Sequence, residues 1–417
     1  MNGLRRVVAD VRAASRVLAR LPGHHRDAVL LEMAEALERR SGEILRDNRL
    51  DVEAAKRART APALIDRLLL DEDRVADMAA GLRAVAALPD PVGVVDGGRR
   101  LPNGLEIVRR RVPLGVVAVI YEGRPNVTAD AVGLCLKSGN AVILRGSRLA
   151  MRSNQIIAEV LTGALIEADA PRWSVALLGS DRDEMRELVQ MEGDVDLVIP
   201  RGGEELKAFL REHTRVPVIY AASGNNHVYV HADADPAMAV KIAVNAKVQR
   251  PGVCNAAETL LVHRDAAPAV LPLAAERLMG SGVELRVDRA GLDLLGDAAG
   301  GLAEATEADY ATEFLDLVLA VRVVASLEEA VDHIARFGSG HSEAIVTDSL
   351  EAAGEFQASV DAAVVYVNAS TRFTDGGEFG MGAEIGISTQ KLHARGPIGL
   401  SELTSYTYLV TGHGHLR

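Results

Sequence analysis

The residues most able to do chemistry in this chain gather around a single cysteine. Residues 249–255 read QRPGVCN and contain Cys254, one of only two cysteines in 417 residues. Pro251 removes a backbone donor and fixes φ, and Gly252 permits unusual backbone angles, so this segment should turn. An exposed thiol on such a turn suits a nucleophile. A lone cysteine is nevertheless a weak signal, and a structural cysteine accounts for this segment equally well.

The elements that must position this turn belong to an alternating α/β pattern. A helical pattern runs from Pro236 to about Lys247, and an apolar strand runs from Glu258 to Val262. The same series continues to about residue 367, with strands expected at 258–263, 283–288, 316–324, 343–347 and 363–367 and helices at 266–280, 327–337 and 349–359. Such a series predicts an open α/β domain.

An earlier α/β series follows Pro113. Its expected strands are 115–121, 141–144, 173–178, 195–199 and 217–221, and its helices are 126–137, 153–168, 181–190 and 203–212. Ligands of open α/β sheets bind at the carboxyl ends of strands, which directs attention to residues 122–126, 145–148, 179–180 and 200–203, a set that contains Arg124, Arg145, Gly202 and Gly203. Residues 4–88 have a helical period. Residues 89–111 break it with turn signals, and indicate either a surface excursion or an arm that pairs with another subunit. Residues 404–411 are expected to pair with this arm.

Composition narrows the class of protein. The length favours two or three domains, and 48% hydrophobic with 25% charged residues is typical of a globular protein. A net charge of −12 argues against a nucleic-acid partner. Two cysteines suit a reducing cytosol, and we expect a cytoplasmic protein. The charged N-terminus favours a helix over a signal peptide, and the absence of an apolar run of about 18 residues argues against a membrane span.

The usual phosphate-binding and metal-binding motifs are missing. No G-x-G-x-x-G opens a helix after a strand, and no G-x-x-x-x-G-K-[ST] occurs. His227 and His231 lie in a strand pattern, where positions i and i+4 are roughly 13 Å apart. A Rossmann dehydrogenase, a P-loop enzyme and a metal site are therefore disfavoured.

Several long segments resemble the γ-glutamyl phosphate reductases, a branch of the aldehyde dehydrogenase superfamily. They are RVPLGVVAVIYEGRPNV at 111–127, CLKSGNAVILRGS at 135–147, VNAKVQRPGVCNAAETLLV at 244–262, VYVNASTRFTDGGEFGMGAE at 365–384 and STQKLHARGP at 388–397. The resemblance extends from about residue 20 to the C-terminus. It implies an aldehyde dehydrogenase-like α/β fold with two open, Rossmann-like domains and a small β oligomerisation arm.

The resemblance also implies a division of labour. Residues 1–90 and 113–233 would bind the cofactor, 234–396 would be catalytic, and 91–112 with 397–417 would form the oligomerisation arm. The expected reaction is NADPH-dependent reduction of L-glutamyl 5-phosphate to L-glutamate 5-semialdehyde, the second step of proline biosynthesis from glutamate. A homo-oligomer is expected, and glutamate 5-kinase is the candidate partner for channelling of the labile substrate.

By resemblance, Cys254 is the nucleophile and Asn126 the oxyanion donor. A thiolate attacks an acyl phosphate, and the resulting thioester accepts hydride. The pKa of Cys254 should therefore lie below the usual value of about 8.5, with Lys247 and Arg250 as nearby sources of positive charge. Lys247 and Arg250 are also consistent with ordinary surface charges that have no role in the chemistry. Asn126 also fits a plain helix N-cap.

The cofactor expectation rests on the residues after the strand at 141–144. Arg145 takes the place of a lysine in NAD-preferring aldehyde dehydrogenases, and Arg148 takes the place of a glutamate that binds the ribose 2′-hydroxyl, with Ser147 between them. Arginine would hold a 2′-phosphate, which favours NADPH. Glu313 and Phe314 match a pair whose glutamate binds the nicotinamide ribose, although Glu313 also fits a solvated helix end.

One departure from hydrolytic aldehyde dehydrogenases bears on the reaction. Their water-activating glutamate has no counterpart in residues 220–227, which read YAASGNNH. A phosphorylating reductase is favoured over the alternative, a hydrolytic NAD(P)-dependent enzyme acting on another semialdehyde. A non-catalytic protein of this fold is the third reading. For the anionic substrate we expect the binding residues Arg124, Arg250, Arg372 and Asp375.

Overall fold

The computed structural model describes residues 3–221 and 223–417, which form two compact units. The first unit contains the chain up to residue 221 together with residues 380–386 and 398–417, and the second contains 222–379 and 387–397. The first boundary falls at 221 and not at 233 as expected. The reason is that β7 (Asn226–Val230) pairs with strands of the second unit on both of its edges.

The first unit is built on a four-stranded parallel sheet. Its strands are β3 (Val116–Tyr121), β4 (Ala141–Arg145), β5 (Val175–Leu178) and β6 (Leu197–Arg201), in the order β5-β4-β3-β6. The expected strand at 217–221 forms isolated bridges and no ladder, and one of these bridges joins Val218 to Val198. Pro217 explains this difference, because it has no N–H to donate to a ladder.

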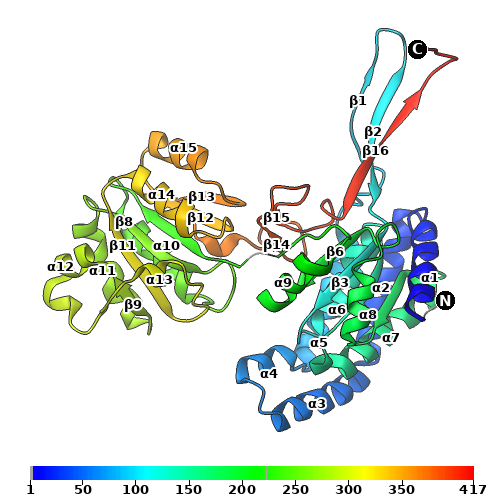
Figure 1. Ribbon diagram of the computed structural model, residues 1–417, viewed down its shortest axis with the longest axis horizontal. Coiled ribbons are helices and arrows are strands. Elements are labelled where there is room, and N and C mark those ends of the chain that lie inside the picture. Colours follow the sequence, from blue (N-terminus) through cyan, green and yellow to red (C-terminus); the bar gives the residue numbers. More distant parts are fainter. Residues whose placement is uncertain (1–2, 222) are drawn as a thin grey trace. The chain divides into compact units, whose positions relative to one another are not determined.

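Helices cover both faces of this sheet (Figure 1). They are α1 (Gly3–Leu18), α2 (Gly23–Arg39), α3 (Ser41–Arg57), α4 (Pro62–Leu68), α5 (Glu72–Ala87), α6 (Asn126–Lys137), α7 (Met151–Glu167), α8 (Arg182–Leu188) and α9 (Glu204–His213). Helices α1, α8 and α9 pack on one face, where Val8 and Val11 of α1 meet alternate strand residues such as Val116 and Ile143. The other strand residues face α6 and α7, which explains why the strands are apolar without alternation.

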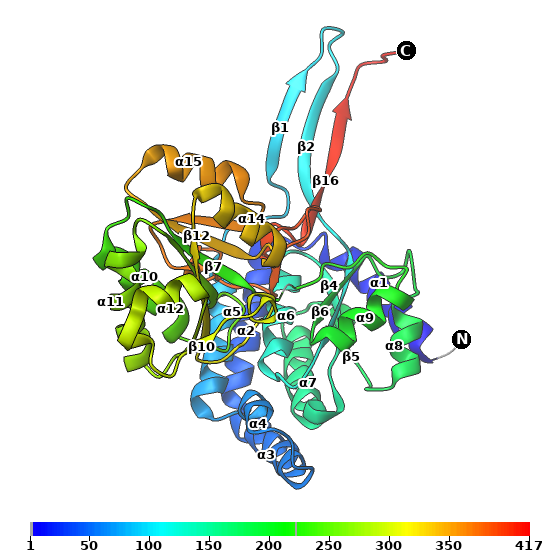
Figure 2. The same cartoon turned by 60° about the vertical axis from the view of Figure 1, so that its left-hand side comes forward.

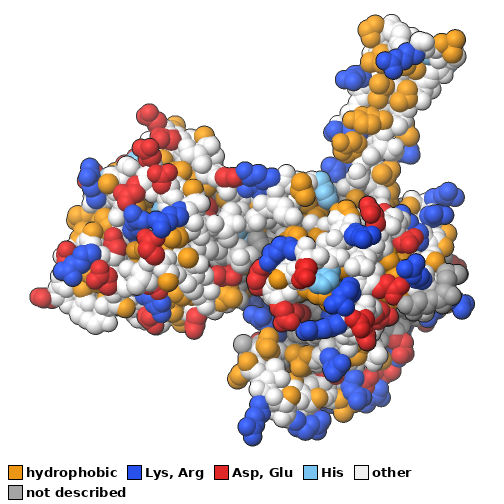
Figure 3. Space-filling model, in the orientation of Figure 1, with side chains coloured by type: hydrophobic (Ala, Val, Ile, Leu, Met, Phe, Trp, Pro, Cys, Tyr) orange, Lys and Arg blue, Asp and Glu red, His pale blue; other side chains and the backbone are white. Residues whose placement is uncertain are grey.

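Three antiparallel strands of the first unit form a projecting arm (Figures 1 and 2). They are β1 (Val95–Arg100), β2 (Glu106–Pro113) and β16 (Thr404–Thr411), in the order β1-β2-β16. The expected pairing of 404–411 with the arm is confirmed. Apolar side chains lie in the open along it (Figure 3), including Tyr406, Tyr408 and Val410, of which Val410 is 57% exposed.

The second unit is a seven-stranded parallel sheet with helices on both faces. Its strands are β7, β8 (Ala257–His263), β9 (Glu284–Val287), β10 (Ala303–Glu304), β11 (Val318–Val324), β12 (Ser342–Val346) and β13 (Val364–Val367), in the order β10-β9-β11-β8-β7-β12-β13. Its helices are α10 (Pro236–Val248), α11 (Ala267–Gly280), α12 (Arg289–Leu295), α13 (Glu307–Tyr310), α14 (Leu327–Phe337) and α15 (Leu350–Ser359). Helices α10 and α11 cover one apolar core, and α14 and α15 cover the other. The order places β8 at the centre of the sheet with β7 beside it. The cysteine segment lies between these two strands in the sequence.

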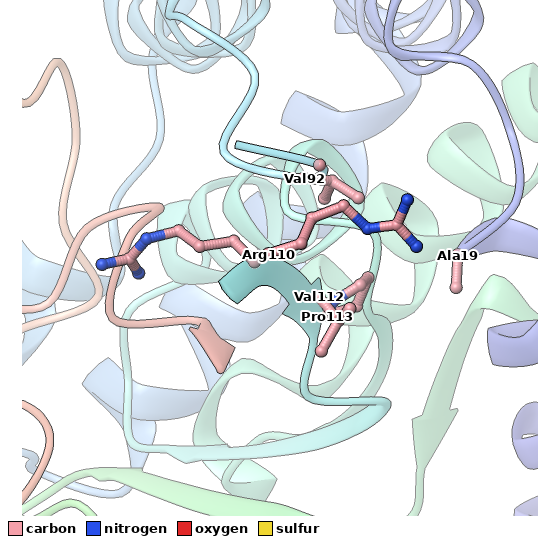
Figure 4. A pocket seen from close by; sticks show the side chains of 7 residues that line it. Ala19, Val92, Arg110, Val112 and Pro113 are labelled. Carbon is pink, nitrogen blue, oxygen red and sulfur yellow. The ribbon is translucent and has the colours of Figure 1, made fainter. Parts of the chain in front are cut away.

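A hollow lies at the root of the arm (Figure 4). It is lined by Ala19, Val92, Gly93, Arg110, Arg111, Val112 and Pro113. These residues carry the arm onto the body of the first unit, and none of them has an expected role in the chemistry. Separately, no helix within residues 3–221 and 223–417 is long and apolar enough to cross a membrane.

Candidate active site

Cys254 lies on the turn that joins α10 to β8. Helix α10 ends at Val248, β8 begins at Ala257, and the thiol between them is partly exposed. Cys135 is instead fully buried within α6, and burial raises the pKa of its thiol. The two cysteines therefore differ in setting: one suits a structural cysteine and the other suits an exposed nucleophile. Cys135 is the packed residue, and Cys254 is the one that solvent and substrate can reach.

Asn226, at the start of β7, holds the backbone of the cysteine turn. Its buried amide donates to the carbonyl of Cys254 at 2.8 Å and to that of Ala256 at 2.7 Å. Its carbonyl oxygen accepts from the N–H of Ser342 on β12 at 3.1 Å. A central strand and its neighbour thus fix the main chain beside the sulfur.

Gly224, two residues before Asn226, approaches the cysteine turn even more closely. A Cβ built on Gly224 would overlap the carbonyl group of Cys254. The N–H of Gly224 donates to Oε1 of Glu313 at 2.6 Å. The segment that lacks the water-activating acid therefore packs against the backbone of Cys254.

Glu313 and Phe314 lie on a loop that is anchored at several points. The N–H of Leu315 donates to Glu258 at 3.2 Å, and Leu315 has a φ of 54°, which is unusual for a residue with a branched side chain. The ring of Phe314 lies 5.1 Å from the guanidinium of Arg286. The solvated-helix reading of Glu313 fails, since this carboxylate accepts a backbone hydrogen bond in a loop.

Lys247 has a different setting from the one expected. Its ammonium group is fully buried and donates to Glu258 at 2.5 Å, and Glu258 is buried as well. Burial lowers the pKa of Lys247 and raises that of Glu258. Lys247 is therefore neither a surface charge nor an available charge for Cys254, because its partner compensates it.

Arg250 and Arg372 provide positive charge near the sulfur instead. Nε of Arg372 donates to Oε1 of Gln249 at 2.7 Å. Burial and the charge of Arg250 lower the pKa of the Arg372 guanidinium, whereas Asp375 and Cys254 oppose this shift. Arg250 is exposed and Arg372 is half-buried. The charges of Arg250 and Cys254 thus both act on the Arg372 guanidinium.

The Asp375 side chain accepts hydrogen bonds from the turn that follows it. Its Oδ1 accepts the N–H of Gly377 at 2.8 Å and that of Glu378 at 3.4 Å. One of its oxygens is therefore committed to ordering the glycine-rich segment. The other remains a candidate for a cationic group.

In the first unit, Asn126 is the first residue of α6. Its exposed amide donates to Oδ2 of Asp130 at 3.1 Å, one turn further along the helix. The N-cap position is Pro125, and no side chain caps it, so the N-cap reading of Asn126 is wrong. Burial raises the pKa of Asp130 to about 6. A single hydrogen bond thus orients the amide.

The expected cofactor residues follow β4 and β6. One NH₂ group of Arg145 donates to the carbonyl of Ser180 at 2.8 Å, its buried Nε has no partner among the described residues, and burial lowers its pKa. Arg148 is exposed at the start of a short 3₁₀ turn, and Oγ of Ser147 accepts from the N–H of Gly123 at 3.2 Å. Charges of Arg145 and Arg148 both contribute to lowering the pKa of Asp181, behind its backbone hydrogen bonds.

Two glycines at the end of β6 complete this edge. A Cβ on Gly202 would meet the Glu122 carboxyl group at 2.8 Å, and the N–H of Gly203 donates to Oε2 of Glu122 at 3.1 Å. Gly203 itself has open space where a Cβ would stand. The end of this strand is therefore shaped by Glu122, which lies in one of the strand-end segments expected to bind ligands.

Comparison with known proteins decides the family. A model of the aldehyde dehydrogenase family matches residues 2–289. The gamma-glutamyl phosphate reductase of Thermoanaerobacter pseudethanolicus is 52% identical over 98% of each chain, and that of Moorella thermoacetica is 54% identical over 97% of this chain and 96% of its own. The chain belongs to the aldehyde dehydrogenase family. A crystal structure of gamma-glutamyl phosphate reductase from Thermotoga maritima is 44% identical, covers 100% of both chains and gives a TM-score of 0.96. The expected aldehyde dehydrogenase-like fold is confirmed.

The structure groups the expected site residues of this family member by unit. Asn126, Arg124, Arg145, Ser147, Arg148, Gly202 and Gly203 belong to the first unit, and Cys254, Arg250, Glu313, Phe314, Arg372 and Asp375 belong to the second. Arg124, a half-buried residue of the β3–α6 turn, is therefore grouped with Asn126 and not with the other two candidate anion-binding arginines.

Three positioning groups were missed from the sequence. They are the Asn226 amide, the Lys247–Glu258 pair and the Asp130 carboxylate. The Asn226 amide could have been noticed from the sequence. The Gly-Asn-Asn sequence at 224–226 stands at the start of an apolar strand, where glycine and asparagine are uncommon. Asp130 could also have been noticed, because it lies at i+4 from Asn126 on the same helix face.

Proposed function

We propose that this chain reduces L-glutamyl 5-phosphate to L-glutamate 5-semialdehyde and phosphate with NADPH, the second step of proline biosynthesis from glutamate. The observation that carries the proposal is the setting of Cys254. Its partly exposed thiol lies on a turn fixed by Asn226, next to Arg372, and residues 220–227 contain no acid. Relatives at about half identity over nearly the whole chain carry this reaction in their names.

Cys254 is the nucleophile in this proposal. Its thiolate attacks the γ-acyl carbon, the carbon–oxygen bond to phosphate breaks, and phosphate leaves with the electron pair. The amide of Asn126 and the backbone N–H of Cys254 stabilise the oxyanion, and loss of one such donor costs about 100- to 1000-fold in rate. Asp130 orients the Asn126 amide through its hydrogen bond of 3.1 Å.

The residues that would hold NADPH fit that cofactor. Members of this family use NAD or NADP, which differ in the group at the ribose 2′ position. The preference is set by the protein residues that contact this group. Arg148 is exposed, and the buried Nε of Arg145 has no partner within the described chain, which suits a 2′-phosphate. Ser147, Gly202 and Gly203 would line the same edge. When bound, the cofactor supplies the hydride that reduces the thioester to the aldehyde.

Glu313 and Phe314 complete the cofactor assignment from the second unit. The Glu313 carboxylate accepts the N–H of Gly224, and its remaining lone pairs are available to ribose hydroxyls. For the substrate we assign Arg124, Arg250, Arg372 and Asp375. Without an acid in residues 220–227, transfer of the acyl group to water lacks a base.

The remaining roles concern assembly. We assign cofactor binding to the body of the first unit, catalysis to the second unit, and oligomerisation to the arm. The exposed apolar residues of β16 support this last role, because long uncovered edges are normally paired. A homo-oligomer in the cytoplasm, with glutamate 5-kinase as a channelling partner, completes the proposal.

The reverse reaction tests the central claim. Glutamate 5-semialdehyde and NADP are mixed with and without inorganic phosphate, and absorbance of the reduced cofactor is followed. We expect phosphate-dependent reduction that Cys254→Ala abolishes and the matched variant Cys135→Ala retains. Equal rates with and without phosphate would contradict the proposal and favour the hydrolytic alternative. Activity retained in Cys254→Ala would favour a different nucleophile.

A further inference from the structure

Two arginines beside Cys254 lie close together without a carboxylate in ion-pair contact. Nε of Arg372 contacts Oε1 of Gln249, the residue directly before Arg250, at 2.7 Å, and the charge of Arg250 lowers the pKa of the Arg372 guanidinium. The ion pairs formed within residues 3–221 and 223–417 include neither of them. Asp375 and Glu378 are the acidic groups that act on Arg372, and both act at longer range. Two like charges held in this way favour an anion between them.

The position of Arg372 relative to the nucleophile is fixed by the residue next to Cys254. The Asn255 amide donates to the carbonyl of Thr374 at 2.8 Å and to that of Arg372 at 3.3 Å. In return, the hydroxyl of Thr371 donates to the carbonyl of Asn255 at 2.7 Å. These bonds join the short turn 371–373 to the cysteine turn from a distance of more than a hundred residues in sequence.

The orientation of the guanidinium is fixed as well. Nε of Arg372 donates to Gln249 at 2.7 Å, which leaves the two NH₂ groups available as donors to a ligand. Guanidinium and phosphate match one another as paired donors and acceptors, and a phosphate carries close to two negative charges near pH 7. A pair of arginines therefore suits a phosphate better than a carboxylate with a single charge.

We infer that Arg250 and Arg372 form the subsite for the phosphate of the acyl phosphate, and do not bind the α-carboxylate. This assignment rests on the proposed function. In glutamyl 5-phosphate the phosphorus is separated from the reacting carbon by one oxygen, whereas the α-carboxylate lies at the far end of the carbon chain. Asn255, the residue after Cys254, holds the turn of Arg372 against the cysteine turn, and the Arg372 guanidinium is therefore placed for the phosphate.

The subsite has the same role in both directions of the reaction. In the forward direction, the sulfur–carbon bond forms, the carbon–oxygen bond breaks, and the departing phosphate takes the electron pair onto an oxygen between the two arginines. In reverse, that oxygen attacks the thioester carbon and the thiolate leaves. The subsite thus lowers the cost of charge on the leaving group and raises the local concentration of phosphate.

The test is the concentration of phosphate at half-maximal rate in the reverse reaction. KM for inorganic phosphate is measured for the full-length enzyme and for Arg250→Ala, Arg372→Ala and Arg372→Lys. The control is Arg264→Ala, an exposed arginine of the same unit that lies 3.9 Å from Asp265. We expect Arg250→Ala and Arg372→Ala to raise KM for phosphate about 10- to 100-fold, with Arg372→Lys intermediate. KM values for NADP and semialdehyde should change less than about twofold.

Each other outcome has a defined meaning. If KM for semialdehyde rises while KM for phosphate stays constant, the pair binds the α-carboxylate and the inference is wrong. If only the pH profile of Cys254 alkylation shifts, the arginines act on the thiolate alone, and the inference is again wrong. If the unmodified enzyme shows no phosphate dependence, the proposed function itself fails. Arg250→Ala covers the case in which Arg372 is needed for folding, because Arg250 is exposed.

Discussion

Gly224 lies so close to Cys254 that a side chain of any size would overlap the Cys254 carbonyl group. The same glycine donates its N–H to Glu313 at 2.6 Å. One small residue therefore connects the nucleophile's main chain with a carboxylate assigned to the cofactor. This contact leaves no room for a larger side chain at position 224.

Gly224→Ala should displace the cysteine turn. The added methyl group must move the Cys254 carbonyl from the Asn226 amide, and we expect activity to fall by about 100-fold or more, as for loss of an oxyanion donor. The measurement is kcat together with the rate of Cys254 alkylation. Gly354→Ala is the matched control in the same unit, since nothing lies near its Cβ position and it lies within α15. There alanine should be neutral or stabilise the helix by up to about 1 kcal/mol. Full activity of Gly224→Ala would contradict the contact.

Lys247→Met should destabilise the second unit strongly. The substitution leaves the Glu258 carboxylate buried without its partner, which costs about 3–5 kcal/mol, or roughly 10 °C in unfolding temperature for a unit of this size. Adding Glu258→Gln should recover part of this loss, because no buried charge then remains. Lys391→Met is the control. It breaks an exposed pair with Asp361 and should change the unfolding temperature by no more than a few degrees. Similar losses for both lysines would argue against the buried pair.

Arg148→Glu should reverse the cofactor preference. A carboxylate repels the 2′-phosphate and accepts a hydrogen bond from a 2′-hydroxyl, so we expect kcat/KM for NADPH to fall about 100-fold while that for NADH rises. Steady-state kinetics with both cofactors measures this ratio. Arg152→Glu changes the charge of the same unit equally at an exposed site on α7 and should leave the ratio unchanged. An unmodified enzyme that prefers NADH would refute the assignment of Arg148.

Asp130→Asn should alter how stability depends on pH. Burial raises the pKa of Asp130 to about 6 from the ordinary 3.8, so the folded state favours the protonated carboxyl group. The stability that this group provides is complete below pH 3.8 and disappears as pH rises through 6. We therefore expect Asp130→Asn to stabilise the first unit at pH 8 by up to about 3 kcal/mol, and to have little effect at pH 3.5.

Thermal unfolding between pH 3.5 and 8 measures this difference. Asp181→Asn provides a comparison of opposite sign. Backbone hydrogen bonds from Glu184 and Asp183 lower the pKa of Asp181, so its contribution is present near neutral pH and disappears in acid. A constant difference between Asp130→Asn and the unmodified chain at every pH would contradict the raised pKa.

The order of helices and strands could be predicted largely from the sequence. Continuous apolar runs such as 116–121 mark strands that are covered on both faces, and α6 was expected at the residues where it lies. These features are local, because a buried parallel strand and an apolar helix each show their environment in their own residues. The turn that carries Cys254 could be predicted for the same reason, because Pro251 and Gly252 within it determine its backbone. The expected strand at 217–221 failed because Pro217 cannot donate to a ladder.

The partners of the site residues were decided by the tertiary structure alone. Lys247 looked like a surface charge, yet it is buried against Glu258, and Arg372 lies beside Gln249 although 123 residues separate them. Asn226 reaches Cys254 only because β7 and β8 are neighbours in the sheet. Helical and strand periods describe which face of an element is buried, but not which element covers it. The sequence therefore determined that a cysteine lies on a Pro-Gly turn of an α/β scaffold, and the order of the strands decided which groups hold that cysteine in place.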